Sequence, residues 1–354
     1  MTSDRRDAFD DLRAIAWTGT SVRLIDQTVL PGRFELLDVT EVDVLVDAIA
    51  RLAVRGAPAL GAAGALGVVV ALDQAAREGW DEAATQDAIR RIRDARPTAV
   101  NLAWGVDAVR PLVAEGRDAV LAAALRIVEE DEAANRELSR RGADWILEQT
   151  GDRPVRVITH CNTGMLATTA WGTALGIVRE LHERGRLGMV YADETRPLLQ
   201  GSRLTAWELR EAGIDHMVQA DTAAASTILR GLVDVAIIGA DRIARNGDTA
   251  NKIGSVGLAL ACADRGIPFV VAAPWSTVDL DTHDGDGIEI ELRPEDEVLH
   301  LGADRTAPEG SRAFNPAFDV TPARLISAIV TERGAVAPEG LAALGASAEV
   351  AVGG

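Results

Sequence analysis

The chain has 354 residues, more than one hydrophobic core usually organises, so two domains are expected. Hydrophobic residues make up 47% and charged residues 25% of the chain, as is usual for a soluble globular protein. The 54 Asp and Glu residues outnumber the 36 Lys and Arg residues, and the formal net charge of -18 excludes nucleic acid and anionic membranes as general partners.

The cysteine content and the N-terminus predict a cytoplasmic protein. Only Cys161 and Cys262 occur, too few for a disulfide framework, although a single bridge between them stays open. Residues 1–11 contain no long apolar run and therefore predict no signal peptide. The longest apolar stretch, residues 57–72, is interrupted by glycines and is too short to span a bilayer.

The first part of the chain is predicted to be mainly helical, with a small β appendage. Residues 21–39 are expected to form two short strands around the turn at Pro31-Gly32. From residue 41 the apolar spacing becomes helical. The predicted helices cover residues 41–54, 59–77, 81–94, 99–114 and 118–149.

After Pro154 short apolar runs alternate with helix-length segments, which is typical of a parallel sheet with βαβ crossovers. We therefore predict an α/β fold, in which a mainly helical domain with a small β-hairpin (residues 1–130) precedes a Rossmann-like parallel-sheet domain (residues 131–354). The predicted strands cover residues 155–160, 187–193, 216–221, 233–241 and 267–273, and a helix is expected over 165–184.

Polar clusters follow four of the predicted strands. Ligands of open parallel sheets bind outside the carboxyl ends of the strands, so four clusters at one sheet edge predict one site. The clusters are His160-Cys161-Asn162-Thr163-Gly164, Asp193-Glu194-Thr195-Arg196-Pro197, Asp221-Thr222 and Asp241-Arg242.

Cys161 is a candidate functional residue. It is expected between a strand and a helix N-terminus, where backbone dipoles favour a thiolate. A lone cysteine is more often a buried structural residue, but the polar neighbours of Cys161 favour a functional role. Cys262 lies in the apolar run LALACADRG and is predicted to pack in a core.

Asp241 is the candidate acid. It follows a nearly uninterrupted apolar strand, and partial burial favours the protonated form that a general acid requires. The spacing fits a second role equally well, in which Asp241 caps a loop or pairs with Arg242.

Three short motifs are candidates for anion binding. Arg55-Gly56-Ala57-Pro58 precedes a helix, with Pro58 suited to the first turn and Arg55 able to bind an anion with two donors. Asn251-Lys252 precedes Gly254-Ser255, where another helix is expected to begin and to offer backbone donors. Arg96-Pro97-Thr98 repeats the arrangement more weakly. Each arginine taken alone is also compatible with an ordinary solvated side chain.

Metal, nucleotide and hydrolase motifs do not occur in the sequence. The five histidines form no HxH or HExxH pattern, and there is no CxxC pair, Walker A motif or GxSxG elbow. GALG at residues 64–67 lies in a predicted helix and is not a dinucleotide fingerprint. The sequence therefore predicts neither a metal nor a cofactor.

Six ordered blocks over nearly the whole chain resemble the methylthioribose-1-phosphate isomerase family, whose fold is shared with regulatory subunits of a translation-initiation exchange factor. The blocks are RGAPALG (55–61), RPTAVNLAW (96–104), THCNTGMLAT (159–168), ADETRPLLQGSRLTAWEL (192–209), GADRIARNGDTANKIGS (239–255) and NPAFDVTP (315–322).

The resemblance implies conversion of 5-methylthioribose 1-phosphate, a sugar phosphate, into 5-methylthioribulose 1-phosphate by a homodimer without a cofactor. It implies that Cys161 and Asp241 are the catalytic pair. The substrate contacts that it implies are Arg55, Gly56, Ala57, Arg96, Gln200, Asn251 and Lys252.

The sequence departs from the family pattern at Asp221-Thr222-Ala223-Ala224, where an Asp-Asn-Met-Ala stretch is usual, and at Thr163 and Met165, where smaller residues are common. These changes leave 5-deoxyribose 1-phosphate and ribose 1,5-bisphosphate as alternative substrates. A regulatory assembly subunit is the alternative from a different class, but such a subunit needs neither Cys161 nor Asp241.

Overall fold

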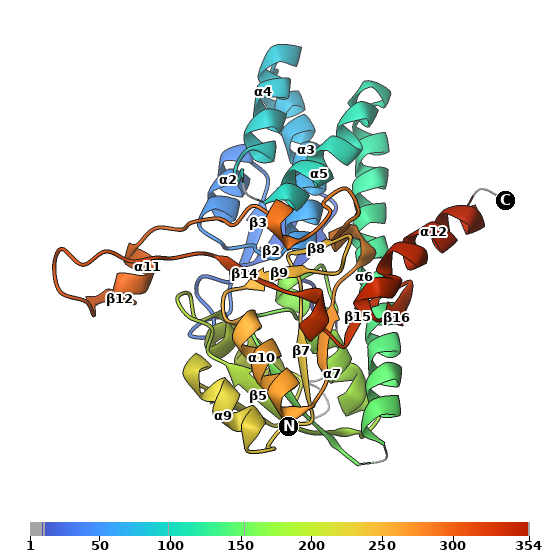
Figure 1. Cartoon of the computed structure of the whole chain (residues 1–354). Coiled ribbons are helices and arrows are strands. Elements are labelled where there is room, and N and C mark those ends of the chain that lie inside the picture. Colours follow the sequence, from blue (N-terminus) through green and yellow to red (C-terminus); the bar gives the residue numbers. More distant parts are fainter. Residues whose placement is uncertain (1–8, 10, 98, 152, 353–354) are drawn as a thin grey trace. The chain divides into compact units, whose positions relative to one another are not determined.

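The computed structural model describes residues 9, 11–97, 99–151 and 153–352, with side chains up to residue 346 (Figure 1). Most of the N-terminal segment on which the signal-peptide prediction rests lies outside these residues, as does Thr98. The chain divides into two compact units, one of residues 1–134 with 163–172 and the other of residues 135–162 with 173–354.

The first unit begins with a three-stranded antiparallel sheet. The predicted hairpin is confirmed as β2 (Val22–Ile25) paired with β3 (Leu36–Val39). A further strand, β1 (Ile15–Trp17), pairs with β2 and was not predicted, because its three residues are too few to show an alternating pattern.

The helices of the first unit follow the predicted order. The fourth predicted helix is split, since its last turn winds as a 3-10 segment with Pro111 near its start. The elements are α2 (Val42–Ala50), α3 (Ala57–Glu78), α4 (Glu82–Arg93), α5 (Val100–Val109) and η1 (Arg110–Glu115). Helix α6 (Arg117–Thr150) continues across the boundary between the two units.

Helix α3 is the core helix of the first unit. Among the described residues it is the one helix long and apolar enough to cross a membrane, by length and composition alone. However, 78% of that apolar window is buried inside the protein, as expected of a helix surrounded by its own unit. Ala and Gly supply much of its buried surface, and these small side chains allow neighbouring helices to approach closely.

Gly56 caps the start of α3 and cannot be replaced without strain. Its φ is 96°, and a Cβ atom there would lie 2.1 Å from the carbonyl oxygen of Ala167. We expect Gly56→Ala to lower the free energy of unfolding by roughly 3 kcal/mol, since a left-handed alanine costs about 1–2 kcal/mol and overpacking about 1–3 kcal/mol. Denaturant unfolding of the purified variant measures this loss.

Gly79 at the other end of α3 provides the matched control. Its φ of 72° is also left-handed, but a Cβ atom there would meet nothing within 4 Å. Gly79→Ala should therefore lose only the conformational term of about 1–2 kcal/mol. Equal losses in the two variants would show that the contact with Ala167 does not constrain Gly56.

The second unit contains the predicted parallel sheet. Its strand order is β16-β15-β10-β7-β4-β5-β6, and every pair is parallel except β15 with the edge strand β16. The strands are β4 (Val155–Thr159), β5 (Leu187–Asp193), β6 (His216–Gln219), β7 (Val235–Ile238), β10 (Phe269–Ala272), β15 (Ala328–Thr331) and β16 (Gly334–Val336).

The helix predicted over 165–184 was wrong in its first half. Only a short 3-10 turn, η2 (Met165–Ala167), forms there, and α7 begins at Ala174 and ends at Glu183. Thr168 and Thr169 instead make hydrogen bonds that close the intervening loop: the hydroxyl of Thr169 donates to Asp131 at 2.7 Å. The other helices between the strands are α8 (Ala206–Glu211), α9 (Ala224–Leu229) and α10 (Ser255–Arg265).

A second, four-stranded sheet in the same unit was not predicted. Its order is β11-β8-β9-β14, formed by β8 (Arg242–Ala244), β9 (Thr249–Lys252), β11 (Val278–Asp279) and β14 (Phe318–Thr321). An arm with α11 (Asp296–Leu299) and the short hairpin of β12 (His300–Leu301) and β13 (Asp304–Arg305) extends away from the body of this unit (Figure 1). A final helix, α12 (Leu341–Val352), follows β16.

Candidate active site

Cys161 lies directly beyond the end of β4 and is only 5% exposed. Its φ of 67° is left-handed, which costs a non-glycine residue about 1–3 kcal/mol and persists only where the surroundings enforce it. Two hydroxyl groups hold this backbone: the N–H of Cys161 donates to Thr195 Oγ1 at 2.9 Å, and Thr205 Oγ1 donates to its carbonyl at 2.7 Å. The thiol is thereby fixed at the carboxyl end of the sheet.

Gln200, a predicted substrate-binding residue, contacts the thiol directly. Its Nε2 atom donates to Sγ of Cys161 at 3.3 Å, and the side chain is buried. Its Oε1 atom is also buried and has no hydrogen-bond partner among the described residues. A buried acceptor without a partner is costly, so this oxygen is suited to receive a hydroxyl group of a ligand.

The clusters that follow β4, β5 and β6 are joined by hydrogen bonds, which confirms that they share one sheet edge. The backbone N–H groups of Thr195 and Arg196 donate to the carboxylate of Asp221, at 2.7 and 2.6 Å. Thr195 in turn accepts from Cys161 and donates to the carbonyl of Asp193 at 3.0 Å. The loop after β5 therefore helps to hold the backbone of Cys161.

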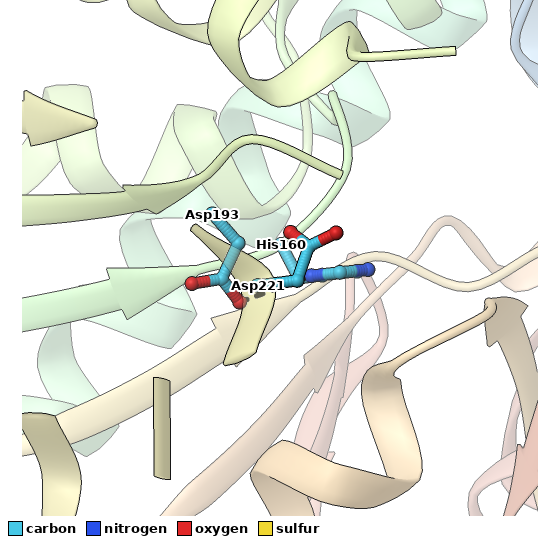
Figure 2. A group of neighbouring side chains, drawn as sticks. All are labelled: His160, Asp193 and Asp221. Carbon is cyan, nitrogen blue, oxygen red and sulfur yellow. Dashed lines mark hydrogen bonds and ion pairs between the residues drawn. The ribbon is translucent and has the colours of Figure 1, made fainter. Parts of the chain in front are cut away.

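His160, the residue before Cys161, forms a buried pair with Asp193. Asp221 lies beside this pair (Figure 2). The two side chains are in contact, with 3.0 Å between Nδ1 of His160 and Oδ2 of Asp193, and Nε2 of His160 lies 2.8 Å from the carbonyl of Ile253. Both residues belong to the predicted strand-end clusters, but the sequence predicted no role for either. No sequence pattern links residues that are 33 positions apart.

Ligand atoms of His160, Asp193 and Asp221 all lie within 4.8 Å of one another, as in sites that could hold a metal ion. Each of these side chains is already engaged by the protein: His160 by Asp193 and Ile253, Asp193 also by Gln219, and Asp221 by two backbone amides. The hydrogen bonds of the protein alone account for the arrangement.

Asp241 lies in the turn from β7 to β8, three residues beyond the end of β7. The predicted strand over 233–241 was therefore too long at its carboxyl end. The side chain is half-buried, and its backbone N–H donates to the carbonyl of Ala250 at 2.9 Å, which ties it to β9. Arg242, the predicted alternative partner, forms its ion pair with Asp279 at 2.7 Å.

Asn251 and Lys252 end β9, on the same hairpin as Asp241. Nδ2 of Asn251 donates to Ser255 Oγ at 3.0 Å, while Nζ of Lys252 lies 4.4 Å from the centre of the Phe318 ring. Because Ile253 follows Lys252 and accepts from His160, the ends of β4 and β9 are connected. Four predicted residues thus lie at or just beyond connected strand ends: Cys161, Asp241, Asn251 and Lys252. Gln200 lies farther along the segment after β5 and joins them through its contact with Cys161.

The N-terminus of α10 is occupied by a carboxylate. Oδ2 of Asp319 accepts from the backbone N–H groups of Gly254 and Val256, at 2.8 and 3.2 Å. Burial raises the pKa of Asp319, against the opposing effect of these two donors. The backbone donors predicted for a ligand at this helix are therefore partly used by the protein itself, and Lys252 is left as the cationic group of the motif.

The remaining predicted residues belong to the first unit. Gly56 is the N-cap of α3, which places Arg55 just before the helix and Ala57 at its first position, and Pro58 occupies the first turn as predicted. Arg96 lies in the turn between α4 and α5. All of these residues are half-buried.

Both cysteines are free thiols in the structure, so no bridge joins them. Cys262 is fully buried in α10, which confirms the prediction of core packing, and burial raises its pKa to about 12. A thiol of this kind stays protonated and inert. The sulfur of Cys161, in contrast, accepts a hydrogen bond from an amide donor.

Comparison with known proteins gives consistent results. Residues 53–338 match the family described as "Initiation factor 2 subunit family". A methylthioribose-1-phosphate isomerase of Xanthomonas campestris pv. campestris is 48% identical over 96% of each chain. A 5-deoxyribose 1-phosphate isomerase of Moorella thermoacetica is 46% identical over 93% of this chain and 95% of its own length.

A probable bifunctional methylthioribose-1-phosphate isomerase/methylthioribulose-1-phosphate dehydratase of Nocardia farcinica is 51% identical over 92% of this chain. The chain spans only 59% of that longer relative.

Solved structures give the same fold. The 5-methylthioribose 1-phosphate isomerase of Pyrococcus horikoshii has a TM-score of 0.88 at 37% identity over 98% of both chains. A structure named translation initiation factor eIF-2B, subunit delta, from A. fulgidus has a TM-score of 0.83 at 40% identity, covering 93% of this chain and 97% of its own. The predicted α/β fold is thus confirmed, and the chain belongs to the initiation factor 2 subunit family, among its methylthioribose-1-phosphate isomerase relatives.

Proposed function

We propose that this chain is an aldose-ketose isomerase that converts 5-methylthioribose 1-phosphate into 5-methylthioribulose 1-phosphate in methionine salvage. The observation that carries the proposal is Cys161, a buried thiol in a left-handed conformation with an amide donor on its sulfur. Strain of this kind is maintained at functional sites. The names of the full-length relatives support the same reaction.

The chemistry explains why an acid is needed. A phosphate on C1 blocks the spontaneous ring opening of an ordinary aldose, so the bond between C1 and the ring oxygen must be broken with the help of a proton. We assign this proton to Asp241, which lies half-buried in the turn after β7.

Hydrogen must then move from C2 to C1, and two routes remain open for Cys161. As a base, the thiolate takes the proton from C2 while the ring opens, and returns it to C1 of the resulting enol phosphate. The C2 hydroxyl then loses its proton as the ketone forms, and this proton balances the one that Asp241 gave to the ring oxygen. In the other route a hydride passes directly from C2 to C1, the C2 hydroxyl loses its proton, and Cys161 stabilises the reacting centre in a dry pocket. Both routes give the same ketose.

The remaining predicted residues would bind the substrate. Gln200 offers a buried amide oxygen to a sugar hydroxyl, and Lys252 offers a cation to the phosphate. We further propose, from the family pattern, that Asn251, Arg55, Gly56, Ala57 and Arg96 contribute contacts.

A direct assay identifies the 5-substituent. The purified enzyme is given 5-methylthioribose 1-phosphate, 5-deoxyribose 1-phosphate and ribose 1,5-bisphosphate in parallel, and ketose formation is measured. We expect the highest kcat/KM for the methylthio sugar. A higher value for either alternative would reassign the substrate within the same reaction, while no turnover of any of the three would exclude the isomerase.

The second candidate function is a regulatory assembly subunit, favoured by the likeness to the eIF-2B delta structure. Such a subunit needs no reactive thiol, so the arrangement around Cys161 supports the enzyme. We also propose a cytoplasmic homodimer, as the family resemblance implies. Sedimentation showing only monomer at working concentration would contradict the dimer.

A further inference from the structure

His160 directly precedes Cys161 and is almost completely enclosed, with 1% of its surface exposed. Its ring packs against the start of α10, where a Cβ atom on Gly254 would lie 2.8 Å from Cε1 of His160. Only glycine leaves room for the imidazole here. The fold thus holds one ring orientation in the residue that precedes Cys161.

The hydrogen bonds determine where the protons lie. The carbonyl of Ile253 can only accept, so Nε2 of His160 carries a proton. On the other side, Nδ1 and Oδ2 of Asp193 are 3.0 Å apart and need one more proton between them. The pair therefore holds one proton beyond those of a neutral imidazole and a free carboxylate.

The neighbouring hydrogen bonds favour placing this proton on the imidazole. Oδ1 of Asp193 accepts from Nε2 of Gln219 at 2.8 Å, and the hydroxyl of Thr227 orients that amide by donating to its oxygen at 2.7 Å. Both oxygens of Asp193 thus receive donors, which favours the carboxylate. Imidazole is also the stronger base of the two groups.

The carboxyl groups that act on His160 are Asp193 from β5, Asp221 and, from β14, Asp319, and the thiol of Cys161 acts on it as well. Burial by itself lowers the pKa of His160, but Asp193, Cys161 and Asp221 together raise it above its ordinary value. Burial raises the pKa of Asp193 as well, against the effect of His160 and Gln219. The pair therefore keeps its shared proton to higher pH than a free histidine does.

We propose that His160 is a positioning residue whose imidazolium, held by Asp193 and the Ile253 carbonyl, provides the positive charge next to which the Cys161 thiolate forms. Electrostatic influence is reciprocal: a thiolate that favours the imidazolium is favoured by it to the same extent. This inference deepens the proposed role of Cys161 and rests on it.

Asp193→Asn separates charge from geometry. The amide oxygen of asparagine can accept from Gln219, and its NH2 group can donate to Nδ1 of a neutral His160, so both hydrogen bonds survive while both charges disappear. His160→Gln is the second variant, which removes the cation but leaves the Asp193 carboxylate. Asp234→Asn is the matched control, a buried carboxylate paired with Arg153 and Arg156 at the start of β4.

Thiolate is measured by its ultraviolet absorbance as a function of pH, each protein being compared with its own Cys161→Ser counterpart. At neutral pH we expect the wild-type protein to hold the most Cys161 thiolate. Asp193→Asn should hold about fivefold less, because the imidazolium cation is lost, and His160→Gln the least, because the Asp193 carboxylate then remains without its cation. Asp234→Asn should match wild-type. Because the pKa of His160 is raised, the imidazolium persists at neutral and weakly acidic pH. The difference in thiolate content between wild-type and Asp193→Asn is therefore present there and narrows as the pH rises through the raised pKa of His160.

Turnover is measured on the same proteins, and thermal unfolding confirms that they are folded. If the thiolate absorbance of Asp193→Asn followed the same pH dependence as wild-type, the inference would be overturned, because the hydrogen bonds without the imidazolium charge would then account for the thiolate. If Asp193→Asn does not fold, the test rests on His160→Gln, and a thiolate content of that variant equal to wild-type would overturn the inference. The absorbance needs no substrate, so its outcome is independent of whether Cys161→Ser abolishes isomerisation.

Discussion

Cys161→Ser is expected to lower kcat by about 10²–10⁴-fold, the usual contribution of a positioned acid or base. A hydroxyl group is close to a thiol in size, so the bonds that hold the backbone of residue 161, from Thr195 and Thr205, should persist. Serine, however, ionises far less readily than cysteine and cannot supply the proton acceptor. Steady-state kinetics with the sugar phosphate, together with circular dichroism, measures the effect.

Cys262→Ala is the control for this variant. Cys262 lies in the core of α10 and touches no predicted site residue by hydrogen bond among the described residues, so turnover should stay at the wild-type level. A small loss of stability is expected from the truncated side chain. If folded Cys161→Ser turned over substrate at nearly the wild-type rate, the thiol would have no part in the reaction.

Asp241→Asn is expected to lower kcat to a similar extent, by about 10²–10⁴-fold. Asparagine has nearly the same shape as aspartate, and the backbone bond from residue 241 to Ala250 does not depend on the side chain. The amide cannot donate an acidic proton to the ring oxygen, so ring opening should become rate-limiting. Kinetics at several pH values, with thermal unfolding to verify the fold, tests this expectation.

Asp248→Asn is the control on the same hairpin. The Asp248 carboxylate accepts from the backbone of Gly285 and Ala323, at 3.0 and 2.7 Å, and so stabilises the turn between β8 and β9. Its loss should lower the unfolding temperature and leave turnover little changed. If Asp241→Asn also lowered the unfolding temperature and left turnover little changed, Asp241 would be a structural carboxylate. That outcome would support its alternative interpretation as a loop cap.

Much of the fold could be predicted from local pattern. The helices α2 to α6 and the strands β4, β5, β6, β7 and β10 follow from apolar periodicity and from turn residues at their ends, since these signals act over a few neighbouring residues. The predictions failed where a segment is short or held from a distance. Strand β1, the β8–β9 hairpin and the loop before α7 depend on partners that only the folded chain supplies.

The sequence by itself placed the candidate site residues: the polar clusters after the strands include Cys161 and Asp241, because strand ends meet at one edge of any parallel sheet. Only the tertiary structure decided how the backbone and thiol of Cys161 are held. The pairing of His160 with Asp193 spans 33 positions, and that of Asp319 with Gly254 spans 65. Such contacts depend on distances of a few tenths of an ångström between distant segments, and local propensity carries no information about them.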